Sequence, residues 1–174
     1  MSEQREDKTR ALGGKYLTFD LADEEYGLEI LKVREIIGLM VITPVPRTAE
    51  YVMGVINLRG KVIPVIDLRL RFDMESTEAT EQTCVIVVDV GNTEIGIIVD
   101  RVSEVLDIPA GNIEDTPIFG ACVNTDFILG IGKRGDKVTI LLDIEKVLMN
   151  TNLAGLEVGP ILQEGQTAET LPAR

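Results

Sequence analysis

The sequence predicts an all-β protein that contains an internal duplication. Short runs of β-branched and aliphatic residues recur along its 174 residues, and Gly, Asn and Pro turn signals separate them. The pattern around Gly27 returns around Gly96, at a shift of 69 positions, and the pattern around Gly54 returns around Gly130, at a shift of 76. Each copy of about 70 residues holds four or five short strands and almost no helix, which is typical of a small barrel or sandwich.

The first copy follows a polar stretch, residues 1–14, which we expect to be a flexible lead. Alternation of apolar and polar residues over 16–21 and 26–30 predicts a hairpin, and 31–37 is interpreted as a strand with an irregular start. The prolines of 43–46 mark a connector, because proline neither donates a ladder hydrogen bond nor continues a helix.

Residues 54–69 form the most informative stretch of the chain. Two apolar β segments flank the polar turn 57–60, and β-branched runs broken by Asn and Gly are the short-range signal of a hairpin. A short helix is expected at 68–72 and a solvated loop at 75–81.

The second copy repeats this order. Residues 84–99 predict a hairpin with Gly-Asn at its turn, and 137–142 alternates as a strand does. The two shifts differ by seven positions, and we place the extra residues in 109–126. A short helix is expected at 144–149, and the Gly-, Thr- and Glu-rich tail 150–174 is expected to be mobile, although its few Leu, Val and Ile residues leave docking open.

Composition excludes several classes of function. The formal net charge is −12. Because nucleic-acid backbones and anionic membranes are bound by clustered Lys and Arg, neither is an expected partner. No apolar run has membrane-spanning length and the N-terminus is charged, so a soluble cytoplasmic protein is expected. Zero histidines remove the usual general base and the commonest metal ligand, and Cys84 and Cys122 have no metal-binding spacing. No metal or cofactor is therefore expected.

Residues 130–135 match the dinucleotide fingerprint G-x-G-x-x-G. That fingerprint needs a helix N-terminus after its last glycine to meet the pyrophosphate, whereas a strand-like segment follows here. A hairpin turn is favoured over a nucleotide site.

Matched acids occupy the two copies, Asp67 with Asp143 and Glu35 with Glu104. A repeated structural contact, such as a hydrogen bond to backbone at a strand end, is the favoured interpretation. A carboxylate-dependent hydrolase using Asp67 or Asp143 stays open as an alternative, as does a small-molecule-binding barrel.

The turn at Arg59 has no counterpart in the second copy, where Arg59 aligns with Gly135. A turn needed only for folding accepts either sequence. Arg59 is therefore either a solvated turn residue or a guanidinium presented to an acidic group of a partner.

Three blocks of the sequence closely resemble the CheW-like family of bacterial chemotaxis coupling proteins. They are YGLEILKVREI at 26–36, GVINLRGKVIPVIDLR at 54–69 and GIIVDRV at 96–102, with Pro46 between the first two. The resemblance is colinear from about residue 15 to 149. It implies two small five-stranded barrels like SH3 domains, packed side by side, with some strands exchanged between the halves 15–80 and 81–149.

The resemblance also implies an adaptor without catalysis, cofactor or metal. Such proteins bind the cytoplasmic tip of methyl-accepting chemoreceptors and the regulatory domain of the histidine kinase CheA, and are recruited from the cytoplasm to membrane receptor arrays through these partners. A coupling protein of a different receptor–kinase array, such as one for surface motility, would carry the same motifs.

Carried over by position, the resemblance implies two sets of contact residues. A groove between the barrels would hold the receptor tip, a helical hairpin, with an apolar floor and charges that fix register. Its predicted residues are Val33, Glu35, Ile36, Arg59 and Cys84, where Cys84 replaces another small apolar residue. The predicted kinase contacts, at the barrel ends, are Gly54, Gly130 and Phe119.

Overall fold

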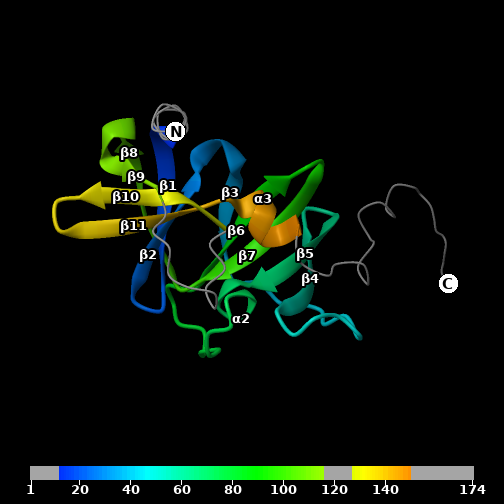
Figure 1. Cartoon of the computed structure of the whole chain (residues 1–174). Helices are drawn as coiled ribbons and strands as arrows, with labels where there is room; N and C mark the ends of the chain where they lie inside the picture. The colour runs from blue at the N-terminus through cyan, green and yellow to red at the C-terminus, as the bar shows by residue number, and fades with distance from the viewer. Residues whose placement is uncertain (1–11, 116–126, 150–174) are drawn as a thin grey trace.

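The computed structural model describes residues 12–115 and 127–149 of the chain, and Figure 1 labels its helices and strands. The strands are β1 Gly14–Leu21, β2 Glu24–Glu29, β3 Val33–Gly38, β4 Val52–Leu58, β5 Lys61–Asp67, β6 Cys84–Val90, β7 Thr93–Val99, β8 Arg101–Ile108, β9 Ile113–Glu114, β10 Ile128–Arg134 and β11 Lys137–Leu142. The helices are η1 Ile30–Lys32, α2 Leu68–Arg71, η2 Ala110–Asn112 and α3 Ile144–Met149. The all-β prediction with a short C-terminal helix is confirmed.

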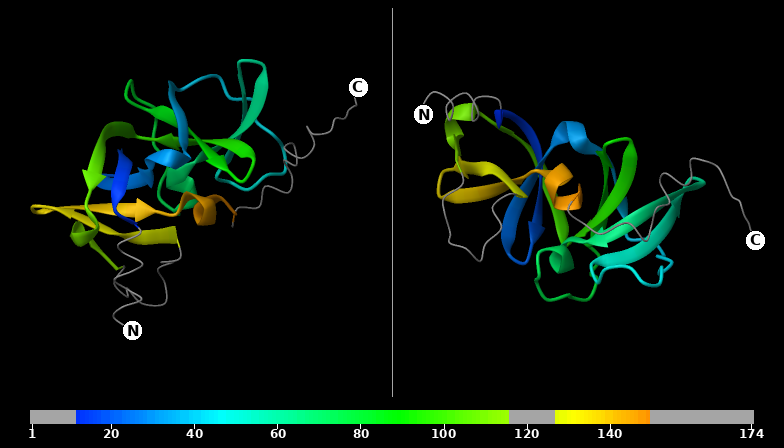
Figure 2. Two further views of the ribbon diagram at one scale, coloured as in Figure 1. Left: turned by 90° about the horizontal axis from the view of Figure 1, so that it is seen from above. Right: turned by 45° about the vertical axis from the view of Figure 1, so that its right-hand side comes forward.

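The strands form two sheets, each curled into an SH3-like barrel. Barrel A has the order β8-β1-β2-β11-β10-β9, and barrel B has the order β3-β6-β7-β5-β4. The views in Figure 2 show the two barrels side by side, with α3 between them.

Each barrel takes strands from both copies of the repeat. Barrel A joins β1 and β2 to strands of the second copy, and barrel B joins β6 and β7 to strands of the first. The joins are the two parallel pairs, β2 with β11 and β5 with β7, whereas the neighbouring pairs within each copy are antiparallel hairpins. The exchange implied by the family resemblance is present in the sheet order.

The largest hydrophobic core lies between the barrels. Phe19 and Leu28 of barrel A and Ile66 and Ile86 of barrel B are fully buried in one cluster. Two smaller clusters fill the individual barrels, around Ile63 and Val85 in B and around Tyr16 and Leu141 in A. Since most apolar burial is shared, each barrel depends on the other for its stability.

Tyr16 illustrates how the smaller barrel-A core handles a polar group. Its hydroxyl donates a hydrogen bond to the backbone oxygen of Leu12, while its ring is buried. Desolvation, with the nearby Glu29 carboxylate, raises the pKa of Tyr16 to about 12. The phenol is therefore neutral throughout the physiological range.

The matched acids Asp67 and Asp143 begin the two helices. The Asp67 carboxylate accepts hydrogen bonds from the backbone N–H groups of Arg69, at 2.9 Å, and Leu70. Asp143 accepts one from the backbone N–H of Lys146 at 3.2 Å. A side-chain oxygen that accepts from these early N–H groups is the usual helix N-cap. The interpretation of both acids as repeated structural contacts is confirmed.

The G-x-G-x-x-G stretch is a hairpin. Its first five residues lie in β10, and Gly135-Asp136 form the turn into β11, with Arg134 and Lys137 as the last paired residues. Strand β11, and not a helix, directly follows the last glycine, so the fingerprint lacks the helix N-terminus that would meet a pyrophosphate. The predicted hairpin is confirmed.

Candidate partner-binding surface

The turn that presents Arg59 is a tight two-residue loop. Leu58 and Lys61 are the last paired residues of β4 and β5, and both Arg59 (φ 54°) and Gly60 (φ 85°) have left-handed backbone. The side-chain oxygen of Asn57 accepts a hydrogen bond from the backbone N–H of Gly60 at 2.8 Å. This local bond helps to fix the turn, because Asn side chains stabilise such reversals.

Arg59 and Glu35 form an ion pair between the turn and strand β3. The guanidinium of Arg59 donates to the Glu35 carboxylate. The side chain of Arg59 is 69% exposed and that of Glu35 is 32% exposed. The sequence analysis predicted two separate charges that would fix the register of a partner. The structure shows that Arg59 and Glu35 form one ion pair on the surface of barrel B.

Strand β3 divides the predicted groove residues between its two faces. Ile36 lies opposite Ile86, and Val33 and Cys84 pack on the shared core between the barrels. Glu35 lies opposite Val87, which belongs to the interior of barrel B. Residues directly opposite in an antiparallel pair share a face. Val33, Ile36 and Cys84 therefore share the face that borders the core between the barrels, and Glu35 reaches Arg59 from the opposite face of β3.

Cys84 lies at the far end of this surface from Val33. It pairs with Gly38, five positions further along β3, which corresponds to roughly 16 Å at the usual rise of a strand. Burial raises the pKa of the Cys84 thiol, so the side chain is a neutral, half-buried apolar group. The five predicted groove residues thus extend along the length of β3, with Arg59 beside its middle.

Exposed apolar residues that the sequence analysis missed continue this surface at both ends. Leu31 on η1 is 91% exposed, and after β3 the chain exposes Leu39, Met40 and Val41, the last at 90%. In the sequence, the run of three apolar residues between a strand and a proline connector could have indicated this exposed surface. Ile36 is 44% exposed between the two groups. Contiguous exposed apolar side chains are typical of a protein-interaction surface.

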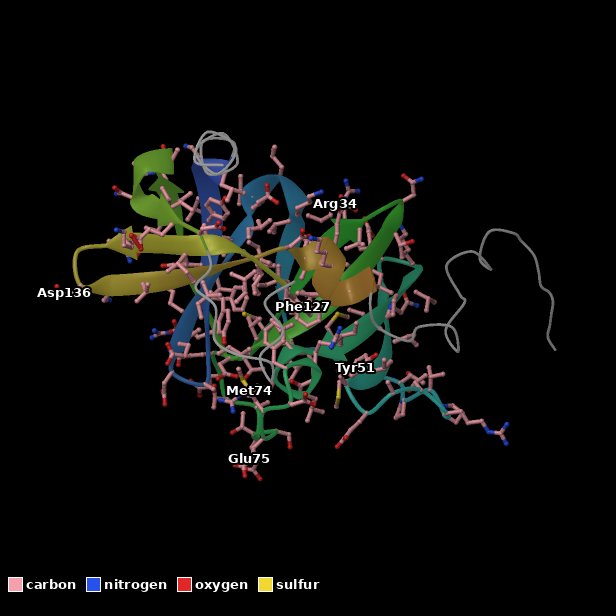
Figure 3. The ribbon with its side chains drawn as sticks, viewed as in Figure 1. Arg34, Tyr51, Met74, Glu75, Phe127 and Asp136 are labelled. Atoms are coloured by element: carbon pink, nitrogen blue, oxygen red, sulfur yellow. The ribbon has the colours of Figure 1, made fainter. Side chains whose placement is uncertain are left out.

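A second group of charges flanks the Arg59 turn. The Glu94 carboxylate forms ion pairs with the Nε of Arg34 at 3.0 Å and with the Nζ of Lys61 at 3.2 Å. Asp89 lies 3.5 Å from the same Arg34 nitrogen. This network holds the ends of β3, β5 and β7 together, and Figure 3 shows Arg34 on the outer surface of the molecule.

The predicted kinase contacts differ in their surroundings. Gly54 is buried with φ 140°, and an added Cβ would lie 2.1 Å from the backbone oxygen of Thr43. Gly130 is also buried, and its added Cβ would lie 3.0 Å from the Glu114 oxygen. Both glycines let a neighbouring segment pair closely with the hairpin. Phe119 lies outside the described residues.

An open, charged pocket of about 760 Å³ lies on the described part of the structure, next to the Arg69 side chain. Its acidic groups outnumber its basic ones, and several are already paired. Arg69 donates two hydrogen bonds to Asp100, which also accepts from the backbone N–H of Ala22 at 2.9 Å. The guanidinium of Arg69 holds the pKa of Asp100 below its usual value. Arg101 also donates two hydrogen bonds to Asp20, both to the same carboxylate oxygen. This mixed lining lacks the apolar walls of a typical small-molecule site.

The structure gives the two helix-capping acids no catalytic arrangement. Burial raises the pKa of Asp67, but its carboxylate is occupied by the N–H groups that it caps. Within residues 12–115 and 127–149 no three acidic or cysteine side chains group as metal ligands would. Over the same ranges, no helix is long and apolar enough to cross a membrane.

Comparisons with known proteins agree on one family. The family model described as "CheW-like domain" matches residues 15–151. The chemotaxis protein CheW of Klebsiella aerogenes is 41% identical over 82% of this chain and 86% of its own length. That of Helicobacter pylori is 34% identical over 83% and 86%. The crystal structure of the scaffolding protein TtCheW from Thermoanaerobacter tengcongensis is similar with a TM-score of 0.73 and 38% identity, over 80% of this chain and 94% of that chain.

Proposed function

The chain belongs to the CheW-like domain family and is a chemotaxis coupling adaptor, and from this premise we propose that it joins the cytoplasmic tip of methyl-accepting chemoreceptors to the regulatory domain of the histidine kinase CheA. It does so without chemistry of its own. The barrels supply two binding surfaces at fixed positions, and the complex forms at receptor arrays on the cytoplasmic side of the membrane.

The receptor would bind along strand β3 of barrel B. The observation that carries this assignment is that successive residues of β3 are both accessible, Glu35 in its ion pair with Arg59 on one face and the exposed Ile36 on the other. A helix that docks in a groove needs apolar anchors and a few charges that fix its register. Val33, Ile36 and Cys84 supply the apolar side, and the pair supplies an exposed guanidinium whose remaining N–H groups can meet an acidic residue of the receptor.

The kinase would bind at the ends of the barrels, near Gly54, Gly130 and Phe119. Gly54 has no side chain to offer, so its contribution is indirect. It lets the segment at Thr43 pair with Val55 through two backbone hydrogen bonds of 2.9 Å. A larger residue at position 54 would displace this segment and change the surface that it presents.

We further propose that residues 15–149 form the functional domain. The approximate halves 15–80 and 81–149 describe the repeat, whereas the barrels as binding bodies follow the exchanged strands. The surfaces at β3 and at the β4–β5 turn belong to barrel B, although the sequence assigns them to the first copy.

The experiment that tests this function is a pull-down of the full chain with a receptor cytoplasmic fragment and, separately, with the kinase regulatory domain. We expect both to be retained by the wild-type chain. Glu35→Lys, which reverses the charge beside Arg59, should lose the receptor fragment and keep the kinase domain. Loss of the kinase domain alone would assign Glu35 to the other interface, and failure of the wild-type chain to retain either partner would refute the proposal.

A further inference from the structure

Arg71 occupies the junction between the two barrels. It lies in α2, which follows strand β5 of barrel B, and its Nε donates a hydrogen bond of 3.0 Å to the backbone oxygen of Val147 in α3, which follows strand β11 of barrel A. One side-chain hydrogen bond therefore joins the helix of one barrel to the helix of the other.

Two aromatic rings, one from each barrel, hold the guanidinium of Arg71. Its central carbon lies 5.2 Å from the ring centre of Tyr51, which precedes β4, and 4.6 Å from that of Phe127, which precedes β10. Figure 3 labels both rings, in the region where α2 and α3 approach each other. A cation over aromatic faces is attracted by the negative charge of each face, and more strongly when partly desolvated, as here.

The repeat shows that this arrangement is asymmetric. Tyr51 and Phe127 correspond at the shift of 76, and their backbone oxygens accept equivalent 2.8 Å hydrogen bonds from the N–H groups of Asp67 and Asp143. The same shift aligns Arg71 with Val147, its hydrogen-bond acceptor. The duplicated framework thus positions both rings and the acceptor, and a single cation from one copy crosses the junction.

The carbonyl that Arg71 meets suits a cation. Val147 lies in the last turn of α3, where backbone oxygens have no partner within the helix and the helix dipole is negative. Planar Arg can stack between two rings and donate from its edge at once, whereas Lys cannot. The wider junction is apolar, since the ring of Phe72 packs 6.1 Å from that of Phe127.

We propose that Arg71 is a latch that fixes the angle between barrels A and B, and that the adaptor needs this fixed angle to pass receptor geometry to the kinase. The need for a fixed angle in signalling rests on the proposed coupling function. The latch between the barrels is a property of the chain alone. Arg71 acts as a positioning residue, because its contacts are with Val147, Tyr51 and Phe127 of the chain itself and it belongs to neither set of proposed partner contacts.

The test compares Arg71→Met, which keeps the length of the side chain and removes its charge, with Arg71→Lys, which keeps the charge and loses the planar stacking. Lys146→Met, an exposed residue on α3, is the matched control. Spin labels introduced through non-natural amino acids at Asn92 and Asp136, exposed turn residues of barrels B and A, report the distance between the barrels by pulsed electron resonance.

We expect one narrow distance distribution in the wild-type chain and the control, and a broad one in Arg71→Met, with Arg71→Lys between them. In the reconstituted assembly, Arg71→Met should retain both partners in pull-downs while kinase activation falls at least about fivefold, the lower end of typical coupling strengths. An unchanged distance distribution in Arg71→Met would overturn the latch, and a broad distribution with full activation would overturn its role in signalling.

Two further outcomes are separable. If the wild-type chain activates no kinase, the coupling function fails, and the distance measurement still tests the latch. If Arg71→Met does not fold, Arg71→Lys carries the test, since a charge is retained at the junction; a wild-type distance distribution and full activation in Arg71→Lys would then refute the need for a stacked guanidinium.

Discussion

The ion pair between Arg59 and Glu35 should matter far more for binding than for folding. Arg59→Ala removes a guanidinium that is 69% exposed from a carboxylate that is 32% exposed. Exposed pairs of this kind contribute about 0.2–1 kcal/mol to stability. The left-handed backbone at position 59 adds no difference, because Ala also carries a Cβ, and the Asn57–Gly60 hydrogen bond remains. For a domain of this size, about 1 kcal/mol lowers the melting temperature by roughly 2–4 °C.

Receptor binding should respond on a different scale. An arginine that anchors an interface typically costs about 2 kcal/mol or more when truncated, which is roughly 30-fold in Kd. The assay is a double-mutant cycle with Arg59→Ala, Glu35→Ala and both, read by thermal unfolding and by affinity for a receptor fragment. The coupling in stability should stay below about 1 kcal/mol.

The charge-swapped chain, Arg59→Glu with Glu35→Arg, is the control for this cycle. It should regain the stability of the pair without regaining receptor affinity, because the receptor meets each charge at its own position. Normal affinity of Arg59→Ala for the receptor fragment would show that the guanidinium makes no receptor contact. A melting temperature lowered by more than about 10 °C would show that Arg59 is a structural residue, since an exposed ion pair cannot supply such a loss.

Three further predictions concern the framework, and urea denaturation measures each. Gly54→Ala should lower the free energy of unfolding by about 3 kcal/mol or more, because its Cβ would meet backbone at 2.1 Å and the residue has a positive φ. Gly130→Ala, whose closest contact would be 3.0 Å, should lower it by about 1–2 kcal/mol. Equal losses would contradict the geometry. Asp67→Ala should cost about 1 kcal/mol through the lost helix cap and Asp67→Asn clearly less, since Asn caps almost as well; equal losses would assign the effect to the charge. Arg69 holds the pKa of Asp100 low, so their pairing stabilises the fold above about pH 4 and is lost as the pH falls through that lowered pKa. The loss in free energy of unfolding caused by Arg69→Met should therefore shrink on acidification. A loss that grew at low pH would contradict the pairing.

Much of the fold was accessible from the sequence because each local pattern agrees with the structure. The hairpin turns, the short helices at 68–72 and 144–149 and the hydrogen bond of Asp67 to backbone follow from residue types at fixed spacing, and the repeat doubled the weight of each observation. The strand exchange does not follow from local pattern. Either partner for β5, from its own copy or the other, would satisfy the same alternation, and long-range pairing decides between them.

The candidate surface was predictable in part. Motif resemblance located Arg59 and Glu35, but their mutual pairing depends on how the β4–β5 turn meets strand β3, which is a tertiary property. The exposed strip from Leu39 to Val41 was missed because three apolar residues in a row do not reveal whether they are buried, and the structure shows them exposed. The junction at Arg71 was missed because its partners are distant in the chain: Tyr51 is 20 positions away and Phe127 is 56 positions away.

Reconstituted signalling shows whether this chain couples receptor to kinase. The measurement is the autophosphorylation rate of full-length CheA, mixed with a receptor cytoplasmic fragment, in the presence and absence of this chain. We expect the chain to raise the rate only when the receptor fragment is also present, and Arg59→Ala to abolish most of this increase while the protein stays folded. A rate that is the same with and without the chain, or an increase that needs no receptor fragment, would contradict the role of a coupling adaptor.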